Sequence, residues 1–266
     1  MASPWAEQRL RDAFAPIIAQ GTPVVVTDRA TAELVKVAAN SFLATKISYI
    51  NAMAEICEAT GADVHDLAEA LAHDTRIGGR FLKPGLGFGG GCLPKDIRAF
   101  THRAEELGVG RSVAFLREVD DINQRRRART VDLVRELAGG GVLDGVRVAA
   151  LGAAFKPNSD DIRDAPALDV AHTLHNLGAQ VRVFDPAAQD NARRAFPHLG
   201  YGDSALDVAR DADVVVLLTE WAEFREIDPA AMGAVVTRRR IVDGRHALDP
   251  AQWRAAGWEY RALGRP

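Results

Sequence analysis

The segment GFGGGCLPKD, residues 87–96, combines residue types that could carry out covalent chemistry. Four glycines in five positions lead to Cys92, and Lys95 and Asp96 follow almost directly. A thiolate is a strong nucleophile, and a nearby lysine and backbone amides favour its formation. Pro94 suits the first turn of a helix, which would place Asp96 one turn after Cys92. The alternatives are an inert buried thiol and an acid that complements the helix dipole.

A second polar pair, Lys36 and Asn40, has the i, i+4 spacing that places two side chains on one face of a helix. Both interrupt a segment that is otherwise apolar around most of its circumference. Buried polar groups need partners, so the pair is a candidate for oxyanion or hydroxyl binding. The alternative is a lysine whose stem lies along apolar surface, beside an incidental asparagine.

Three blocks of different composition must position these residues. Residues 1–30 hold a short amphipathic piece and TPVVVTD, which predicts a buried strand. Residues 31–137 are mainly helical, beginning with a helix of about thirty residues from the N-cap Thr31 to the stop at Gly61. This central domain continues with a shorter helix capped by Asp63 and a long loop over residues 74–93. It ends with a helix from Pro94 and another helix over about 112–137.

Residues 138–266 alternate between short β-branched runs and helical segments, after a glycine-rich linker at 138–145. The expected strands are 146–151, 180–185, 213–219, 240–244 and WEYRAL at 258–263. The expected helices lie around 166–177, 187–195, 204–210 and 221–232. This alternation predicts a parallel sheet with right-handed crossovers. The fold class is therefore α/β, with a long-helix central domain followed by a Rossmann-like domain.

The dinucleotide fingerprint G-x-G-x-x-G does not follow any expected strand. LGAAFKP follows the first strand of the C-terminal block, but it has one glycine and the bulky Phe155. A nucleotide would have to be bound in another way, and Lys156, Arg163 and Arg245 are candidates because they lie near the carboxyl ends of strands.

Composition excludes several classes of protein. The chain has 266 residues, a net charge of −3 and no apolar run of membrane-spanning length, so neither a nucleic-acid nor a membrane partner is expected. Cys57 and Cys92 are too few for a disulfide scaffold, and the seven histidines show no ligand spacing, so no metal site is predicted. No signal peptide is visible, which favours a cytoplasmic protein.

Four motifs occur in a characteristic order: ELVKVAANSFLATKISYINAMAEI, RIGGRFLKPGLGFGGGCLPKD, LGAAFKPNSDDIRDAPAL and IVDGRHAL. Together they resemble the UDP-glucose/GDP-mannose dehydrogenase family, from about residue 24 to the end. The resemblance implies NAD-dependent oxidation of a nucleotide sugar, and FLKPGLGFGGGCLPKD is most similar to the branch that converts UDP-glucose to UDP-glucuronate. Members of the family begin with a Rossmann domain that binds NAD.

TPVVVTD resembles the last strand of that Rossmann domain, so residues 1–30 are expected to be its remnant and the chain to be incomplete. A separate Rossmann partner could complete it. The long helix is expected to form a homodimer, because a helix that is apolar on most sides is buried by several neighbours.

The resemblance also implies roles for single residues. Cys92 would hold the oxidised carbon as a thiohemiacetal and then a thioester, and Asp96 would assist the water that cleaves it. Lys36 would stabilise the developing alkoxide, with Asn40 beside it. The implied substrate-binding residues are Lys36, Asn40, Arg76, Phe81, Leu82, Lys83, Gly85, Phe88, Gly89, Phe155, Lys156 and Arg245, the last from a neighbouring loop or subunit. The implied NAD-binding residues are Cys92, Lys95 and Arg163.

The glycines at 85, 87 and 89–91 would let backbone amides approach the ligand closely. The alternative is a flexible connector, although such connectors seldom carry Phe, Leu and Phe.

Other functions remain open from the sequence. The chain could be an inactive UDP-sugar-binding dimerisation module, or a dehydrogenase for GDP-mannose or UDP-N-acetylmannosamine. It could also be a regulatory subunit that meets a partner through the basic segment NQRRRAR at 123–129, although a solvated helix face is the simpler interpretation of that segment.

Overall fold

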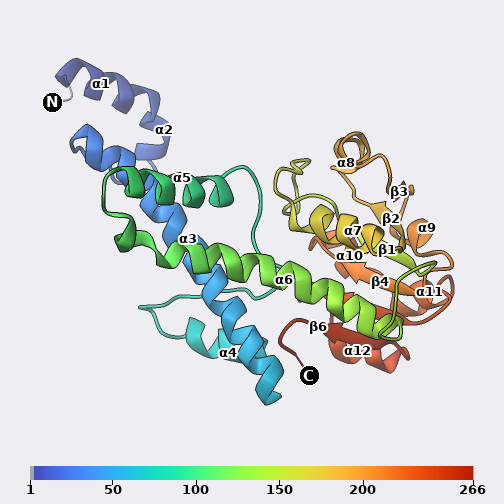
Figure 1. Ribbon diagram of the computed structural model, residues 1–266. Helices are drawn as coiled ribbons and strands as arrows, with labels where there is room; N and C mark the ends of the chain where they lie inside the picture. Colours follow the sequence, from blue (N-terminus) through green and yellow to red (C-terminus); the bar gives the residue numbers. More distant parts are fainter. Residues whose placement is uncertain (1–2, 266) are drawn as a thin grey trace.

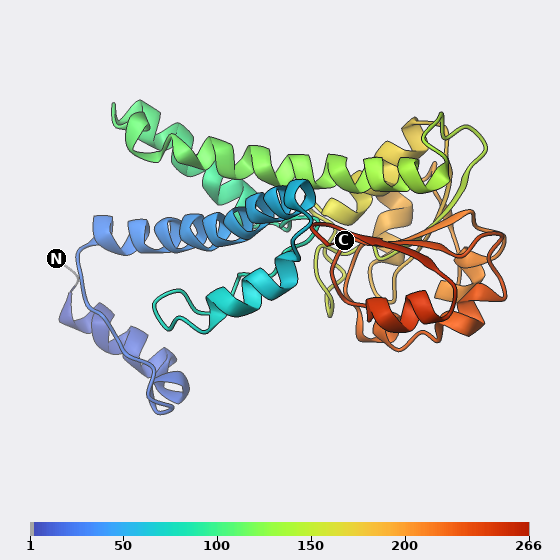
Figure 2. The same ribbon diagram turned by 90° about the horizontal axis from the view of Figure 1, so that it is seen from below.

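The computed structural model describes residues 3–265 as a helical part followed by an α/β part (Figure 1). The helical part contains α1 (Pro4–Ala13), α2 (Ala15–Ile18), α3 (Arg29–Thr60), α4 (Val64–Ala72), α5 (Leu93–Glu106), a 3-10 turn (Gly110–Val113) and α6 (Phe115–Ala138). α3 packs against α5 and α6, and α6 continues onto the sheet (Figures 1 and 2). α6 therefore packs against elements of both parts. None of the described helices is both long and apolar enough to cross a membrane.

The α/β part is one six-stranded parallel sheet in the order β3-β2-β1-β4-β5-β6. Its strands are β1 (Arg147–Leu151), β2 (Gln180–Phe184), β3 (Gly200–Tyr201), β4 (Val214–Leu217), β5 (Arg240–Asp243) and β6 (Glu259–Ala262). Its helices are α7 (Pro166–Asn176), α8 (Gln189–Ala195), α9 (Ala205–Ala209), α10 (Ala222–Arg225), α11 (Pro229–Gly233) and α12 (Pro250–Ala255). The strand order reverses between β1 and β4, so a crevice for a ligand is expected beyond their carboxyl ends.

The predicted fold class is confirmed, and the differences are local. The chain contains β3 and α12, which are too short to give a sequence pattern, and α10 and α11 replace one expected helix. Asp28, not Thr31, is the N-cap of α3, because its carboxylate accepts from the Thr31 amide at 2.9 Å. Gly61 ends α3 in the left-handed conformation, with φ 75°, as expected.

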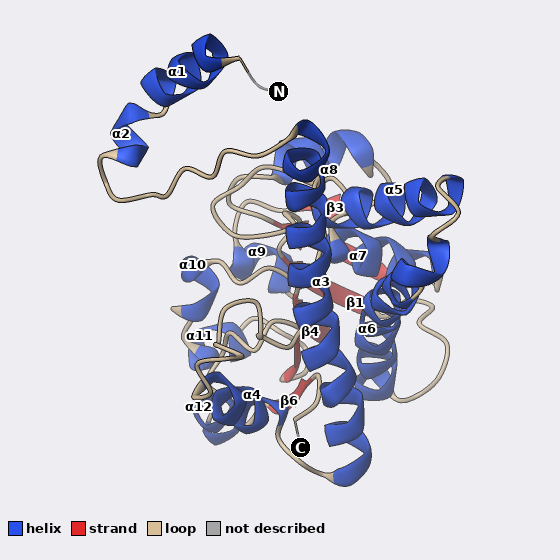
Figure 3. Cartoon of the chain, turned by 90° about the vertical axis from the view of Figure 1, so that its left-hand side faces the viewer, coloured by secondary structure: helices blue, strands red, loops and turns tan. Residues whose placement is uncertain are grey.

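The expected strand TPVVVTD is wrong. Residues 22–28 form no strand and Val25 is 83% exposed, because no described strand pairs with this segment. Figure 3 shows α1 and α2 standing away from the body on this extended segment.

The glycine-rich loop between α4 and α5 is pressed against the α/β part. A Cβ atom on Gly89 would lie 2.1 Å from the Asp164 carbonyl oxygen, and one on Gly90 would lie 2.7 Å from the Phe155 ring. Both glycines are buried. Glycine is therefore required at both positions because a side chain would clash where the two parts pack together. This requirement is separate from any role of these glycines toward a ligand.

Replacing Gly89 with alanine is expected to lower the free energy of unfolding by about 1–3 kcal/mol, because overpacking against backbone cannot relax through a side chain. Urea denaturation measures the change. Gly141→Ala is the matched control, since nothing lies within 4 Å of the Cβ position there. Equal stability of Gly89→Ala and Gly141→Ala would contradict this packing argument.

Candidate functional site

A cluster of four polar residues joins α3 to the start of α5. The Asp96 carboxylate accepts from Lys36 Nζ, and from Asn40 Nδ2 at 2.6 Å. Lys95 Nζ lies 3.5 Å from the other carboxylate oxygen. The structure therefore brings Asp96 into contact with Lys36, 60 residues before it in the chain, and with Asn40, 56 residues before it.

The hydrogen bond from Lys36 is the main cause that holds the pKa of Asp96 below its usual range. Burial of the carboxylate opposes this effect, and Asn40 adds to it. The same hydrogen bond raises the pKa of Lys36. At neutral pH the cluster therefore holds an ammonium beside a carboxylate.

Cys92 lies at the N-terminus of α5, one turn before Asp96, whose amide donates to the Cys92 carbonyl at 2.9 Å. Cys92 is exposed, whereas Cys57 is buried in the core. Burial raises the pKa of the Cys57 thiol. Next to Cys92, a Cβ atom on Gly91 would lie 2.6 Å from the Arg163 guanidinium carbon. The Arg163 guanidinium therefore lies against the backbone beside the exposed Cys92.

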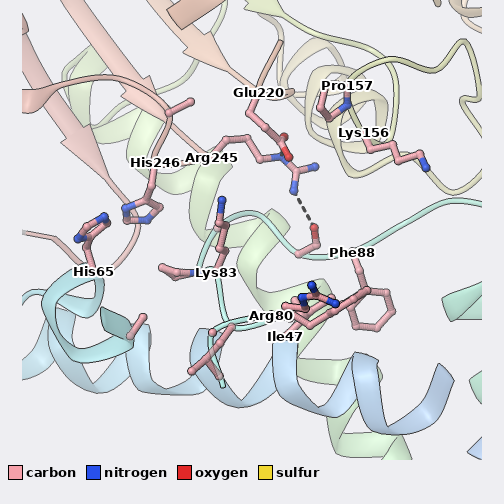
Figure 4. Close-up of a pocket in the computed structure, with 18 of the residues that line it drawn as sticks. Ile47, His65, Arg80, Lys83, Phe88, Lys156, Pro157, Glu220, Arg245 and His246 are labelled. Atoms are coloured by element: carbon pink, nitrogen blue, oxygen red, sulfur yellow. Dashed lines mark hydrogen bonds and ion pairs between the residues drawn. The ribbon is translucent and has the colours of Figure 1, made fainter. Parts of the chain in front are cut away.

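A cavity of about 900 Å³ lies between the helical part and the carboxyl ends of β1, β4 and β5; Cys92 and the Lys36–Asn40–Asp96 cluster are not among the residues that line it. Phe88, Gly89 and Leu93 line it, and they flank Cys92 in the chain. Nine predicted substrate-binding residues line this cavity: Phe81, Leu82, Lys83, Gly85, Phe88, Gly89, Phe155, Lys156 and Arg245. Figure 4 shows Lys83, Lys156 and Arg245 around the same space.

Arg245 comes from the loop after β5 of the same chain. Its Nε donates to the Leu218 carbonyl at 2.8 Å and its Nη1 to the Gly87 carbonyl at 2.9 Å, the contact drawn as a dashed line in Figure 4. Its Nη2 is buried and has no hydrogen-bond partner among the described residues. A held guanidinium with a spare donor beside a cavity suits an anionic group such as a phosphate.

Two predictions about the loop need correction. The amides of Gly85 and Gly90 do not face a ligand, because they donate to Asn51 Oδ1 and to the Arg163 carbonyl, each at 2.9 Å. Arg76 does not line the cavity. It is exposed and pairs with Asp74, two residues before it, in a local turn.

Asn123 on α6 is a positioning residue that the sequence analysis missed. Its Oδ1 accepts from the Phe88 amide at 2.7 Å and its Nδ2 donates to the Phe88 carbonyl at 2.9 Å, and the residue is 1% exposed. It therefore clamps the backbone of the glycine-rich loop. A polar residue on the buried face of a helix is the signal that could have revealed it.

The prediction of a solvated helix face for the basic segment at 123–129 is only partly correct, because two of its arginines are buried. Arg126 is buried and pairs with Glu58 on α3, and Arg127 is buried and contacts Asp164 and the Phe88 carbonyl. Arg126 thus links α6 to α3, and Arg127 links α6 to the loop before α7. Their positive charges are therefore not available to bind a partner protein.

A parallel sheet with a cavity at its topological switch point, and an exposed cysteine one helical turn from a Lys–Asn–Asp cluster, define an α/β protein with a ligand cavity at the switch point. The chain belongs to the UDP-glucose/GDP-mannose dehydrogenase family. The family's central-domain model matches residues 30–125, and its UDP-binding-domain model matches residues 149–250.

Curated relatives and solved structures agree with this assignment. The chain is 40% identical over 261 residues to a UDP-glucose 6-dehydrogenase of Rickettsia conorii, which covers 97% of this chain and 59% of the relative. It is 39% identical to UDP-glucose 6-dehydrogenase TuaD of Bacillus subtilis, covering 92% of this chain and 52% of the relative. The structure of a UDP-glucose dehydrogenase from Pyrobaculum islandicum superposes with a TM-score of 0.87 at 33% identity, covering all of this chain and 57% of that one. The chain thus spans between half and three fifths of each of these relatives.

Proposed function

We propose that this chain supplies the thiol and the nucleotide-sugar site for NAD-dependent oxidation of UDP-glucose to UDP-glucuronate. The observation that carries the proposal is the exposed Cys92, whose chain neighbours Gly89 and Leu93 line a cationic cavity and which lies one helical turn from Asp96 of the Lys36–Asn40–Asp96 cluster. The UDP-glucose 6-dehydrogenase names of the relatives support the choice of substrate.

NAD would be held on one side by Lys95, which lies 3.5 Å from the Asp96 carboxylate, and by Arg163, which lies beside Gly91 and pairs with Asp161. No described strand is followed by the G-x-G-x-x-G turn that cradles a pyrophosphate. When bound, NAD+ supplies a hydride acceptor for each of the two oxidations. A separate Rossmann domain is proposed as the partner that holds its other side.

Residues of this chain would carry out the other steps of the reaction. Lys36, with Asn40, would stabilise the sugar oxygen as its proton leaves and an aldehyde forms. Cys92 Sγ would bond to the aldehyde carbon and form a thiohemiacetal. Loss of the second hydride from this thiohemiacetal to a second NAD+ would then give a thioester. Asp96 would take a proton from the water that attacks the thioester, which releases a carboxylate and restores the thiol.

Binding of the nucleotide sugar can be tested separately from its oxidation. Calorimetry is expected to detect UDP-glucose binding, and Lys156→Ala is expected to weaken it about 10-fold through loss of one charge-assisted contact. Lys156 is exposed at the cavity, so this change does not challenge folding. Arg210→Ala, at a second cavity near the starts of β1 and β2, is the control. Absence of UDP-glucose binding would refute the proposal, and binding without oxidation in the presence of a Rossmann partner would favour the inactive binding module.

A homodimer through α3 is part of the same proposal. Val35, Phe42, Tyr49 and Ile56 recur every seven residues on α3 and are between 51% and 66% exposed. A stripe of this kind along one helix face suits packing against a second copy.

Replacing Phe42 with glutamate is expected to shift the chain from dimer to monomer, because a charge would be buried at the centre of the stripe. Sedimentation velocity measures the change. Trp5→Glu, on the exposed face of α1, is the control and should leave the mass unchanged. A wild-type chain that sediments as a monomer at micromolar concentration would contradict the dimer.

A further inference from the structure

Asp185 is a buried carboxylate that the proposed oxidation does not use. It directly follows β2 and is 2% exposed. Its Oδ2 accepts from the Ala153 and Ala154 amides at 2.7 and 2.9 Å, and from Trp221 Nε1 at 3.1 Å. Its Oδ1 accepts from the amides of residues 187 and 188, at 3.0 and 2.7 Å. One carboxylate therefore joins the loops that follow β1, β2 and β4.

Two of these loops form part of the wall of the cavity at the switch point. Phe155 and Lys156, which follow the two bound alanine amides, line the cavity, and so does Glu220, which precedes Trp221. Figure 4 shows Lys156 and Glu220 at the same edge of the cavity. Asp185 and Trp221 do not line the cavity themselves. Asp185 can therefore act on a ligand only through the loops that it holds.

We propose that Asp185 is a positioning residue of the nucleotide-sugar site, a role that rests on the proposed function. Its Oδ2 holds donors from the loops after β1 and β4 at the same time, so separating these loops would break hydrogen bonds inside the protein. Thr219 Oγ1, which donates to the Ala154 carbonyl at 2.7 Å, ties the same two loops. This link would keep Lys156 at the distance from Glu220 that the ligand requires, and a site held too loosely by its supporting residues loses affinity.

Replacing Asp185 with asparagine tests the role, because the side chain keeps its size and loses acceptors. Whichever way the amide is turned, its NH2 group faces two or three N–H donors instead of accepting from them. We expect the variant to bind UDP-glucose about 10- to 100-fold more weakly in calorimetry. The NMR signal of the Trp221 indole N–H, identified by its loss in Trp221→Phe, should shift and exchange faster with water.

Asp213→Asn is the matched control. Asp213 Oδ2 accepts from the Arg147 amide at 3.0 Å, next to the start of β4 and thus at the opposite end of the sheet. This variant should bind UDP-glucose as the unaltered chain does and leave the Trp221 indole signal unchanged. Urea denaturation of both variants ensures that the affinities are compared between folded chains.

The role of Asp185 is overturned if Asp185→Asn binds UDP-glucose as tightly as the unaltered chain, or if Asp213→Asn loses as much affinity. If Asp185→Asn does not fold, Trp221→Phe decides the question, because it removes the indole donor and keeps an aromatic ring. We expect Trp221→Phe to weaken binding about 3- to 10-fold through loss of one hydrogen bond, and unchanged binding would overturn the role. An unaltered chain that binds no UDP-glucose would refute the proposed function itself, together with this role.

Discussion

Replacing Cys92 with alanine is expected to lower the rate of UDP-glucuronate formation by at least about 1000-fold. Without the thiol no thioester can form, although the alcohol can still be oxidised to the aldehyde by the first hydride transfer. The products therefore shift toward aldehyde, with at most one NADH for each sugar consumed. The measurement follows NADH and UDP-glucuronate in the chain supplied with NAD+, UDP-glucose and a Rossmann domain of the family.

The second cysteine provides the control for this experiment. Cys57 is 2% exposed in the helical core, and burial raises the pKa of its thiol, so Cys57→Ala should retain the oxidation. Iodoacetamide should likewise modify the exposed Cys92 faster than Cys57, and UDP-glucose should protect Cys92. Carboxylate formation that survives Cys92→Ala would exclude the thioester route.

Replacing Asp96 with asparagine is expected to slow thioester hydrolysis by about 100- to 10,000-fold, because the water loses its general base. The acylated form should then accumulate on Cys92 and appear as an added mass in the intact protein. Lys36 loses its ion-pair partner in this variant, so the first oxidation should also slow. If turnover is retained and no acylated intermediate accumulates, the role of Asp96 is only to complement the dipole at the N-terminus of α5.

The pH dependence of stability tests the same ion pair independently of turnover. Lys36 and Asn40 hold the pKa of Asp96 below its usual range, so ionised Asp96 stabilises the folded chain above its unfolded pKa of about 3.9. This contribution is lost as the pH falls through the lower folded value. The difference in free energy of unfolding between the unaltered chain and Asp96→Asn should therefore be constant from about pH 5 to 9 and shrink below about pH 4. A difference that already shrinks between pH 7 and 5 would contradict the lowered pKa.

The parts of the site that depend on local spacing could be predicted from the sequence alone. Lys36 and Asn40 share one face of α3, and Pro94 begins the helix that sets Asp96 one turn after Cys92. The β-branched runs likewise predicted five of the six strands, because period and strand length are properties of a few neighbouring residues.

How distant segments meet could not be predicted from local patterns, because such contacts depend on how the helices pack on one another and on the sheet. Contacts between distant segments occupy the Gly85 and Gly90 amides and turn Arg126 and Arg127 inward, and Arg76 is left outside the cavity. The tertiary structure also leaves TPVVVTD without a strand to pair with, although its composition predicted a buried strand. His65 and His246 are 181 positions apart in the numbering, and no local pattern could reveal that both line one cavity. Their shared cavity arises because α4 and the loop after β5 face one another only when the two parts are packed.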